Sequence, residues 1–169
     1  MTVQITPAQS KGASPLFLRE AEIRRGIELL YFGYSHLNRA VDERLAKQGL
    51  GRAHQRALYF IARQPGLIVS DLLKLLAITK QSLGRVINDL AARDLVVSVP
   101  GRTDRRQKLL KLTEAGTELE ASLFDDLREQ LAHAYGEAGQ NAVSGFWQVL
   151  EGLIPAEEIA RISALQQGD

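Results

Sequence analysis

Residues 70–90, SDLLKLLAITKQSLGRVINDL, contain the pattern of two short helices joined by a tight turn. Ser70 and Thr79 stand where N-caps are expected, because their side-chain oxygens can accept hydrogen bonds from the first free amides of a helix. Apolar residues recur at helical steps of three and four, at Leu72, Leu75, Leu76, Leu83, Val86, Ile87 and Leu90. The pattern predicts helices at about 71–76 and 80–92, which together indicate a helix-turn-helix.

A β-hairpin is predicted directly after these helices. The segment LVVSV, residues 95–99, is rich in β-branched residues and ends at the turn signal Pro100-Gly101. The segment KLLKL, residues 108–112, is suited to be the return strand. A hairpin in this position would be the wing of a winged helix-turn-helix.

The turn of this hairpin is strongly basic. Its cationic residues within 100–111 are Arg102, Arg105, Arg106, Lys108 and Lys111. Arginine suits the narrow, negative minor groove of DNA, and lysine acts as a compact charge on phosphate. Asp104, two residues before Arg106, could hold an arginine in an aimed rotamer. We therefore expect the wing tip to contact DNA; the alternative is that its cations only keep the hairpin soluble.

The second predicted helix carries polar residues suited to base recognition, namely Lys80, Gln81, Ser82, Arg85 and Asn88. Helical spacing places Gln81, Arg85 and Asn88 in one row, away from the apolar residues. Arginine suits guanine, glutamine and asparagine suit adenine, and the first turns of such a helix enter the major groove. The other interpretation is an ordinary solvated helix face.

Helices are also predicted on both sides of the winged segment. An apolar stripe from Ile23 to Leu45 indicates one long helix, and a second helix is expected at 52–63. After the hairpin, a helix is expected from Thr113, broken at Gly136 and Gly139. Further helices are expected at 140–154 and after Pro155. The predicted fold class is therefore mainly α with a small β-hairpin wing.

Composition restricts the classes of function. The 169 residues are 45% hydrophobic and 24% charged, which is ordinary for one soluble globular domain. There is no cysteine, which excludes a disulfide framework, a thiolate metal site and a cysteine nucleophile. No apolar run approaches the roughly 18 residues that span a bilayer, and the N-terminus lacks the apolar core of a signal peptide. We expect a cytoplasmic protein with no membrane partner.

The net charge of +1 conceals a strong asymmetry. Residues 79–111 hold 8 Lys/Arg and 3 Asp/Glu, whereas residues 112–169 hold 2 and 11. The basic segment is a candidate phosphate-binding face, and the acidic segment should lie away from a polyanion.

Signatures of catalysis and of metal binding are missing from the sequence. Phosphate-loop, H-E-x-x-H and G-x-S-x-G motifs do not occur. The three histidines, His36, His54 and His133, lack the spacing of metal ligands. We therefore expect no enzyme activity, no cofactor and no metal site.

Two blocks carry a resemblance to the MarR family of bacterial transcription regulators. They are QPGLIVSDLLKLLAITKQSLGRVINDLAARDLV, residues 64–96, and PGRTDRRQKLLKLTEAG, residues 100–116. The Asp-Arg-Arg at 104–106, followed by Leu-Thr-Glu-Ala-Gly at 112–116, is the most specific part. The segments LREAEIRRGIELLYFGYSHL and GLGRAHQRALYF are similar to a PetP-like subgroup.

The resemblance implies a homodimer that binds double-stranded DNA. A flexible arm at 1–15 would precede one domain at 16–169, with the winged helix-turn-helix at about 52–112 and dimerisation helices at about 18–48 and 113–166. Lys80, Gln81, Ser82 and Arg85 would then meet the major groove. Arg106, oriented by Asp104, would meet the minor groove or the flanking phosphates with Arg102 and Arg105. Ser70 and Thr79 would cap their helices and could also touch the DNA backbone. A two-fold dimer implies a pseudo-palindromic operator with half-sites about one helical turn apart.

Family resemblance also implies a repressor modulated by a small aromatic or anionic effector. Tyr31, His36 and Tyr59 are the candidates for an effector pocket, although each could equally be a core or interface residue. An alternative to DNA binding is a winged-helix protein-interaction module, which would predict a wing poor in arginine. The operator, the regulated genes and the effector are not encoded in any motif.

Overall fold

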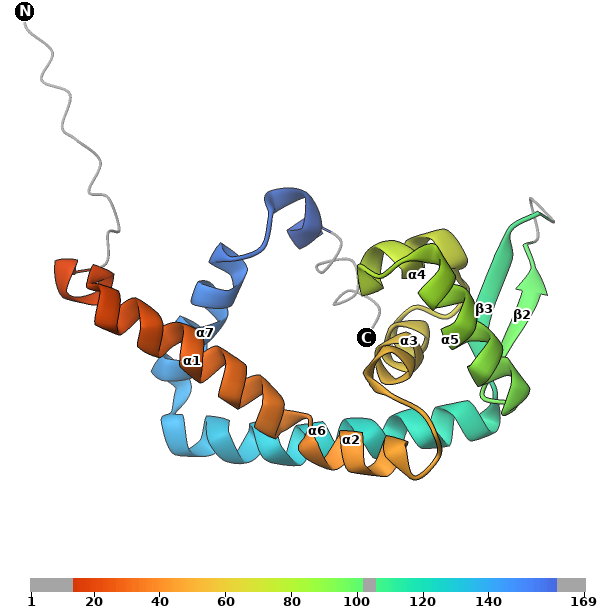
Figure 1. Cartoon of the computed structure of the whole chain (residues 1–169), viewed down its shortest axis with the longest axis horizontal. Coiled ribbons are helices and arrows are strands. Elements are labelled where there is room, and N and C mark those ends of the chain that lie inside the picture. Colours follow the sequence, from red (N-terminus) through yellow and green to blue (C-terminus); the bar gives the residue numbers. More distant parts are fainter. Residues whose placement is uncertain (1–13, 102–105, 161–169) are drawn as a thin grey trace, which may run out of the picture. The chain divides into compact units, whose positions relative to one another are not determined.

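The computed structural model describes residues 14–101 and 106–160. Figure 1 shows that these residues are largely helical, with a small sheet near the middle of the chain. In chain order the elements are η1 (Pro15–Leu18), α1 (Glu20–Leu37), α2 (Arg39–Ala46), α3 (Arg52–Arg63), β1 (Leu67–Ile68), α4 (Val69–Leu76), α5 (Lys80–Ala92), β2 (Val96–Pro100), β3 (Lys108–Leu112), α6 (Glu114–Ala138) and α7 (Gln140–Gly152).

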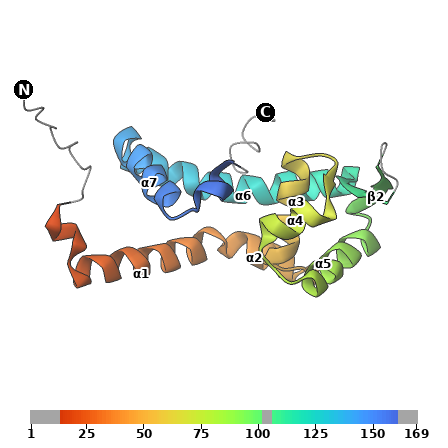
Figure 2. The same ribbon diagram turned by 90° about the horizontal axis from the view of Figure 1, so that it is seen from above.

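The chain divides into two compact units, one up to Leu37 and one from Asn38 onward. In the first unit, the short helix η1 leads into α1, which Figure 2 shows as one unbroken helix. Its predicted apolar stripe is exposed within this chain, at Ile23, Ile27, Leu30 and Tyr34. A stripe of this kind is stable in water only when another surface covers it.

The long helix predicted from Ile23 to Leu45 is interrupted at Asn38, so that part of the prediction was wrong. α1 ends at Leu37 and α2 begins at Arg39. Asn38 is buried, with only 6% of its surface exposed, and it occupies the N-cap position of α2. Its side chain makes no cap hydrogen bond and its backbone stays in the helical region, so the interruption is a single turn residue. The apolar period continues across the break, which is why the pattern alone did not reveal it.

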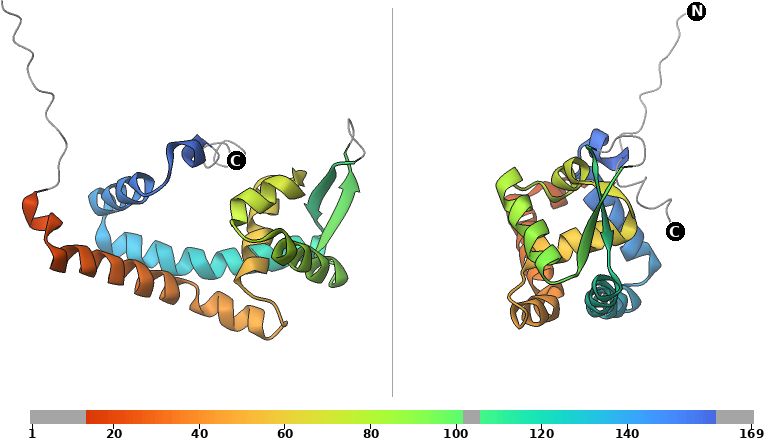
Figure 3. Two further views of the ribbon diagram at one scale, coloured as in Figure 1. Left: turned by 45° about the horizontal axis from the view of Figure 1, so that its top comes forward. Right: turned by 90° about the vertical axis from the view of Figure 1, so that its right-hand side faces the viewer.

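The winged helix-turn-helix is formed by α3, α4, α5 and an antiparallel sheet with strand order β1-β3-β2. The predicted hairpin is confirmed, with Val96 opposite Leu112 and Pro100 opposite Lys108. β1 was not predicted; it is two residues long and pairs Leu67 with Leu110. Figure 3 shows the hairpin extending beyond the body formed by these helices.

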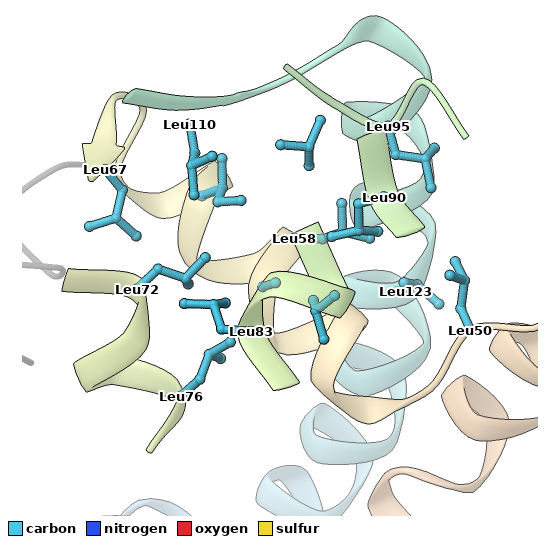
Figure 4. Packing of buried hydrophobic residues seen from close by; sticks show 14 of the residues in the cluster. Leu50, Leu58, Leu67, Leu72, Leu76, Leu83, Leu90, Leu95, Leu110 and Leu123 are labelled. Atoms are coloured by element: carbon cyan, nitrogen blue, oxygen red, sulfur yellow. The ribbon is translucent and has the colours of Figure 1, made fainter. Parts of the chain in front are cut away.

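A leucine-rich core holds these elements together (Figure 4). Leu58 on α3, Leu72 on α4, Leu83 and Leu90 on α5 and Leu110 on β3 are all at most 1% exposed. Full burial of one such side chain stabilises the fold by roughly 1.5–3 kcal/mol. The core therefore fixes α5 through its apolar face and leaves the opposite face in solvent.

The helices after the hairpin differ slightly from their predicted bounds. α6 continues through Gly136 and ends at Ala138, where Gly139 adopts φ +78°. α7 then turns away from the end of α6 (Figure 1 and Figure 3). Residues 156–160 begin another helix, and the Pro155 carbonyl accepts hydrogen bonds from its first amides. Pro155 therefore lies just before this helix, one position earlier than expected.

Candidate nucleic-acid interface

The N-terminus of α5 is held by Thr79, as predicted. Thr79 Oγ1 accepts a hydrogen bond from the Ser82 amide at 3.1 Å and donates one to Ser82 Oγ at 2.9 Å. The turn before it contains Ala77 in the left-handed region, with φ +51°. This geometry starts α5 at Lys80 and determines which side chains the first two turns expose.

The predicted base-contacting residues lie together on the exposed side of α5. They are Lys80, Gln81, Ser82, Arg85 and Asn88, and all are exposed. On the opposite side, Leu83, Val86 and Leu90 are buried in the core. The result is a polar helix surface with cationic and amide side chains that can donate hydrogen bonds.

Ser70 does not have its predicted role as an N-cap. α4 begins one residue earlier, at Val69, and Ile68 occupies the cap position without a side-chain hydrogen bond. The reason is that β1 leads directly into the helix, so the extended residue before it is Ile68. Ser70 is exposed in the first turn of α4.

The wing is described at its base but not at its tip. Arg102, Asp104 and Arg105 lie outside the described residues, so their predicted contacts have no structural counterpart here. Arg106 and Lys108 are exposed. Below them, the Gly101 amide donates a hydrogen bond of 2.9 Å to the Gln107 carbonyl and closes the two strands.

Thr113 and Gly116 fasten the base of the wing to α6. Thr113 Oγ1 donates to the Asp94 carbonyl at 2.6 Å and accepts from the Gly116 amide at 3.0 Å. The Thr113 amide also donates to the Leu95 carbonyl. A Cβ at Gly116 would lie 1.9 Å from that carbonyl oxygen, so only glycine allows this approach. Both residues belong to the Leu-Thr-Glu-Ala-Gly motif. The predicted helix start at Thr113 is confirmed, because Thr113 is the N-cap of α6, whereas the close contact at Gly116 was not predicted.

α3 braces both helices of the helix-turn-helix. Arg56 donates a hydrogen bond of 3.1 Å to the Leu75 carbonyl near the end of α4. His54 contacts the Asp89 carboxylate on α5 at 3.2 Å. Neither contact was foreseen, because partners 19 and 35 residues apart leave no local pattern.

Ion pairs connect α2 to its neighbours. Arg44 makes two hydrogen bonds of 2.8 Å to Asp126 on α6. Arg52 is hydrogen-bonded to Asp42, and this contact holds the pKa of the Asp42 carboxyl below its ordinary value. On α6, burial raises the pKa of the Glu120 carboxyl.

The residues predicted for an effector pocket are distributed over both units of the chain. Tyr31 and His36 are exposed on α1, which belongs to the first unit. Tyr59 is half-buried on α3 and packs edge-on against Phe60, with 5.5 Å between the ring centroids. A hollow of about 400 Å³ on α6, lined by Asp125, Asp126, Arg128, Glu129 and Ala132, contains none of the three.

Within residues 14–101 and 106–160, no three histidine, aspartate or glutamate side chains gather in a way that could hold a metal ion. The helices of that same part of the chain include none that is long and apolar enough to cross a membrane.

The helix-turn-helix, the hairpin behind it and the exposed polar side of α5 define a winged helix-turn-helix protein. A sequence model of the MarR family matches residues 48–107. The HTH-type transcriptional regulator PetP of Rhodobacter capsulatus is 44% identical over 143 residues, covering 85% of this chain and 86% of PetP. The chain belongs to the MarR family of transcriptional regulators, which confirms the resemblance and places it among regulators rather than enzymes.

Solved structures of the family share this fold. A mutant MarR from E. coli complexed with operator DNA has a TM-score of 0.64 and 21% identity, covering 84% of this chain and 100% of that one. PcaV from Streptomyces coelicolor in complex with its natural ligand has a TM-score of 0.61 and 16% identity, covering 84% and 96%. At these identities the similarity establishes the fold.

Proposed function

We propose that this chain is a sequence-specific DNA-binding regulator that acts as a homodimer on a pseudo-palindromic operator. One observation carries the proposal: the described part of α5 presents its polar and cationic residues to solvent while its apolar face is buried in the core. A helix held in this way can enter the major groove without unfolding any part of the domain.

Specific contacts are assigned to the first turns of α5. Arg85 is suited to guanine, and Gln81 and Asn88 are suited to adenine. Lys80 and Ser82 are assigned to the major groove beside them, and Thr79 and Ser70 to the DNA backbone. The exposed start of α4 favours a backbone contact for Ser70, although Ser70 does not cap that helix.

The wing is assigned to the minor groove and its phosphates. Arg106 and Lys108 are exposed at the start of the return strand, and Arg102, Asp104 and Arg105 are adjacent to them in the sequence. Electrostatic attraction supports this assignment, because arginine is favoured where the minor groove is narrow and its potential most negative.

The dimer is supported by apolar residues that this chain leaves exposed. On α1 they include Leu29, Leu30, Tyr31 and Phe32, and on α7 they include Trp147 and Val149. A second copy would cover such surfaces, and residues 16–169 would then work as one domain with α1, α6 and α7 as dimerisation helices. Two-fold symmetry requires two half-sites about one helical turn apart.

Regulation is proposed to be repression relieved by a small aromatic or anionic effector. NadR was solved with 4-hydroxyphenylacetate, which is a small aromatic anion, and PcaV with its natural ligand, so proteins of this fold bind ligands. Tyr31, His36 and Tyr59 are the candidate contacts in this chain. Binding of the chain over a promoter would exclude polymerase until the effector lowers its affinity for DNA.

Selection from a random duplex library at near-physiological salt tests the DNA-binding proposal. A pseudo-palindromic consensus with half-sites one turn apart is expected. Arg85→Ala and Arg106→Ala should each weaken binding to the selected duplex by about 1–3 kcal/mol. Arg128→Ala is the matched control, because Arg128 is an exposed, ion-paired arginine on α6.

Two outcomes would contradict the proposal. Enrichment without symmetry would mean that the basic wing binds phosphate only, or that the true partner is a protein, as in the alternative of a winged-helix interaction module. Equal affinities for the Arg85→Ala variant and the wild type would remove α5 from the interface.

A further inference from the structure

The contact between His54 and Asp89 joins two elements that the core already packs together. His54 is the third residue of α3, and Asp89 lies on α5, one helical turn after Arg85. The imidazole Nε2 is 3.2 Å from Asp89 Oδ2. The His54 side chain is 14% exposed and that of Asp89 is 51% exposed. The histidine is therefore held by its surroundings, while the carboxylate belongs to the edge of the solvent-facing surface.

The hydrogen bond at the other ring nitrogen, Nδ1, determines which nitrogen of His54 carries the proton. The Gly51 amide donates a hydrogen bond of 3.1 Å to Nδ1, so Nδ1 must be unprotonated. The neutral ring then has its proton on Nε2, which donates to Asp89. The His54 imidazole thus accepts a hydrogen bond from a free amide at the start of α3 and donates one to Asp89 on α5.

Arg93 lies between the end of α5 and the loop before α3. Its Nη1 donates a hydrogen bond of 3.0 Å to the Asp89 carbonyl. Its Nη2 would lie 3.5 Å from a Cβ at Gly49, so the side chain reaches over that loop. The hydrogen bond between His54 and Asp89 therefore joins α5 to α3, and the Arg93 side chain lies close to Gly49 beside it.

Apolar packing and a hydrogen bond constrain a helix differently. The buried leucines of α5 resist its removal from the core, but hydrophobic attraction is non-directional and tolerates small rotations about the helix axis. A hydrogen bond has a preferred length and angle and opposes such rotations. Because Asp89 is four residues from Arg85, a rotation of α5 that breaks the contact also moves Arg85.

We propose that His54 is a positioning residue for DNA recognition: through Asp89 it sets the rotation of α5 and so aligns Arg85 and Gln81 with the bases. The proposal rests on the proposed function of α5. Binding to phosphate depends on charge and tolerates rotation, whereas base contacts require alignment. Loss of this hydrogen bond should therefore lower selectivity. Non-specific affinity should stay unchanged in His54→Ala and rise in Asp89→Ala, which also removes a negative charge from the edge of the DNA-facing surface.

The experiment compares dissociation constants for two duplexes of equal length, the one selected with the wild-type protein and a random sequence. Selectivity is the dissociation constant for the random duplex divided by that for the selected duplex. His54→Ala and Asp89→Ala should each reduce this ratio by about 3- to 10-fold. The double variant should lose no more than the larger single effect, because both changes break one contact. Asp125→Ala, which removes an exposed ion-paired carboxylate from α6, is the control for the altered charge.

Rescue separates positioning from general stability. His54→Gln keeps an amide oxygen for the Gly51 amide and an N–H group for Asp89, so it should restore most of the selectivity. Melting temperatures measured in parallel should fall more for His54→Ala, which also loses the hydrogen bond from the Gly51 amide, than for Asp89→Ala, so an equal loss of selectivity in both variants is not an effect of stability. Urea titration of each variant verifies that it is folded under the binding conditions.

Three results would overturn the proposal. The first is an unchanged ratio in His54→Ala while the wild type still discriminates. The second is a loss of selectivity in Asp89→Ala alone, because Asp89 would then contact DNA directly. The third is additive losses in the double variant. Failure of the proposed function is distinguishable, because the wild type itself would then select no duplex.

Discussion

Gly116 is the residue at which the wing and the long helix α6 meet most closely. The Leu95 carbonyl occupies the space that a side chain at position 116 would need. The same carbonyl accepts a hydrogen bond from the Thr113 amide. Backbone lies on both sides of the contact, so neither partner can move away as a flexible side chain would. The absence of a side chain at position 116 therefore lets the backbone just before β2 lie directly against α6.

Gly116→Ala should destabilise the protein by at least about 2 kcal/mol, because an added methyl group overpacks a rigid site. The control is Gly136→Ala in the same helix, where a Cβ meets nothing within 4 Å. That change should stabilise by about 0.5–1 kcal/mol, since alanine loses less backbone entropy in a helix. Urea denaturation followed by circular dichroism measures both. Equal effects at the two positions would remove the special role of Gly116.

At the scale of elements, the two helices of the helix-turn-helix begin in different ways. α5 starts with a side-chain cap from Thr79, whereas α4 follows β1 directly and has no side-chain cap. The pairing of β1 with β3 holds the start of α4 in place of a cap. Similar sequence signals at Ser70 and Thr79 therefore have different structural consequences.

Thr79→Ala should cost about 1 kcal/mol of unfolding free energy, which is typical of a lost N-cap. Ser70→Ala should change stability by less than about 0.5 kcal/mol, as expected for an exposed residue without a cap bond. Chemical denaturation of the two variants side by side gives the difference. A larger loss for Ser70→Ala would mean that Ser70, after all, supports the start of α4.

At the scale of the whole molecule, exposed apolar residues demand an explanation. α1 leaves its predicted stripe uncovered, and α7 leaves Phe146 and Trp147 about half exposed. Trp147 donates a hydrogen bond of 3.0 Å to the Tyr135 hydroxyl, so it is held in a defined position rather than free in solvent. Large exposed apolar surfaces on a folded chain mark interaction sites.

Leu30→Glu should convert the proposed dimer into a monomer, because it places a charge in the centre of the α1 stripe. Sedimentation equilibrium at micromolar concentration should then report half the wild-type mass. Arg24→Glu, which changes an exposed, ion-paired residue near the start of the same helix, should remain dimeric. The single tryptophan, Trp147, offers a second readout through its emission. A wild-type monomer at this concentration would contradict the dimer itself.

Much of the fold could be predicted because its signals are local. Repeated apolar steps of three and four identified α3, α5 and α6, and β-branched residues before Pro100 identified β2. The exposed row on α5 followed from the same periodicity. Caps were predicted less reliably, because a serine near a helix start does not reveal what precedes it in space.

Residues 70–112 by themselves determined the helix-turn-helix, the hairpin and the side of α5 that faces solvent, because each depends on neighbours within a few turns of the chain. Only the tertiary structure decided that Leu67 adds a third strand, that Gly116 meets Leu95 and that His54 reaches Asp89. These contacts join residues far apart in the sequence, so they produce no periodic pattern in the sequence from which they could be predicted. Their positions follow from how the leucine core packs the helices, which is a property of all the elements together.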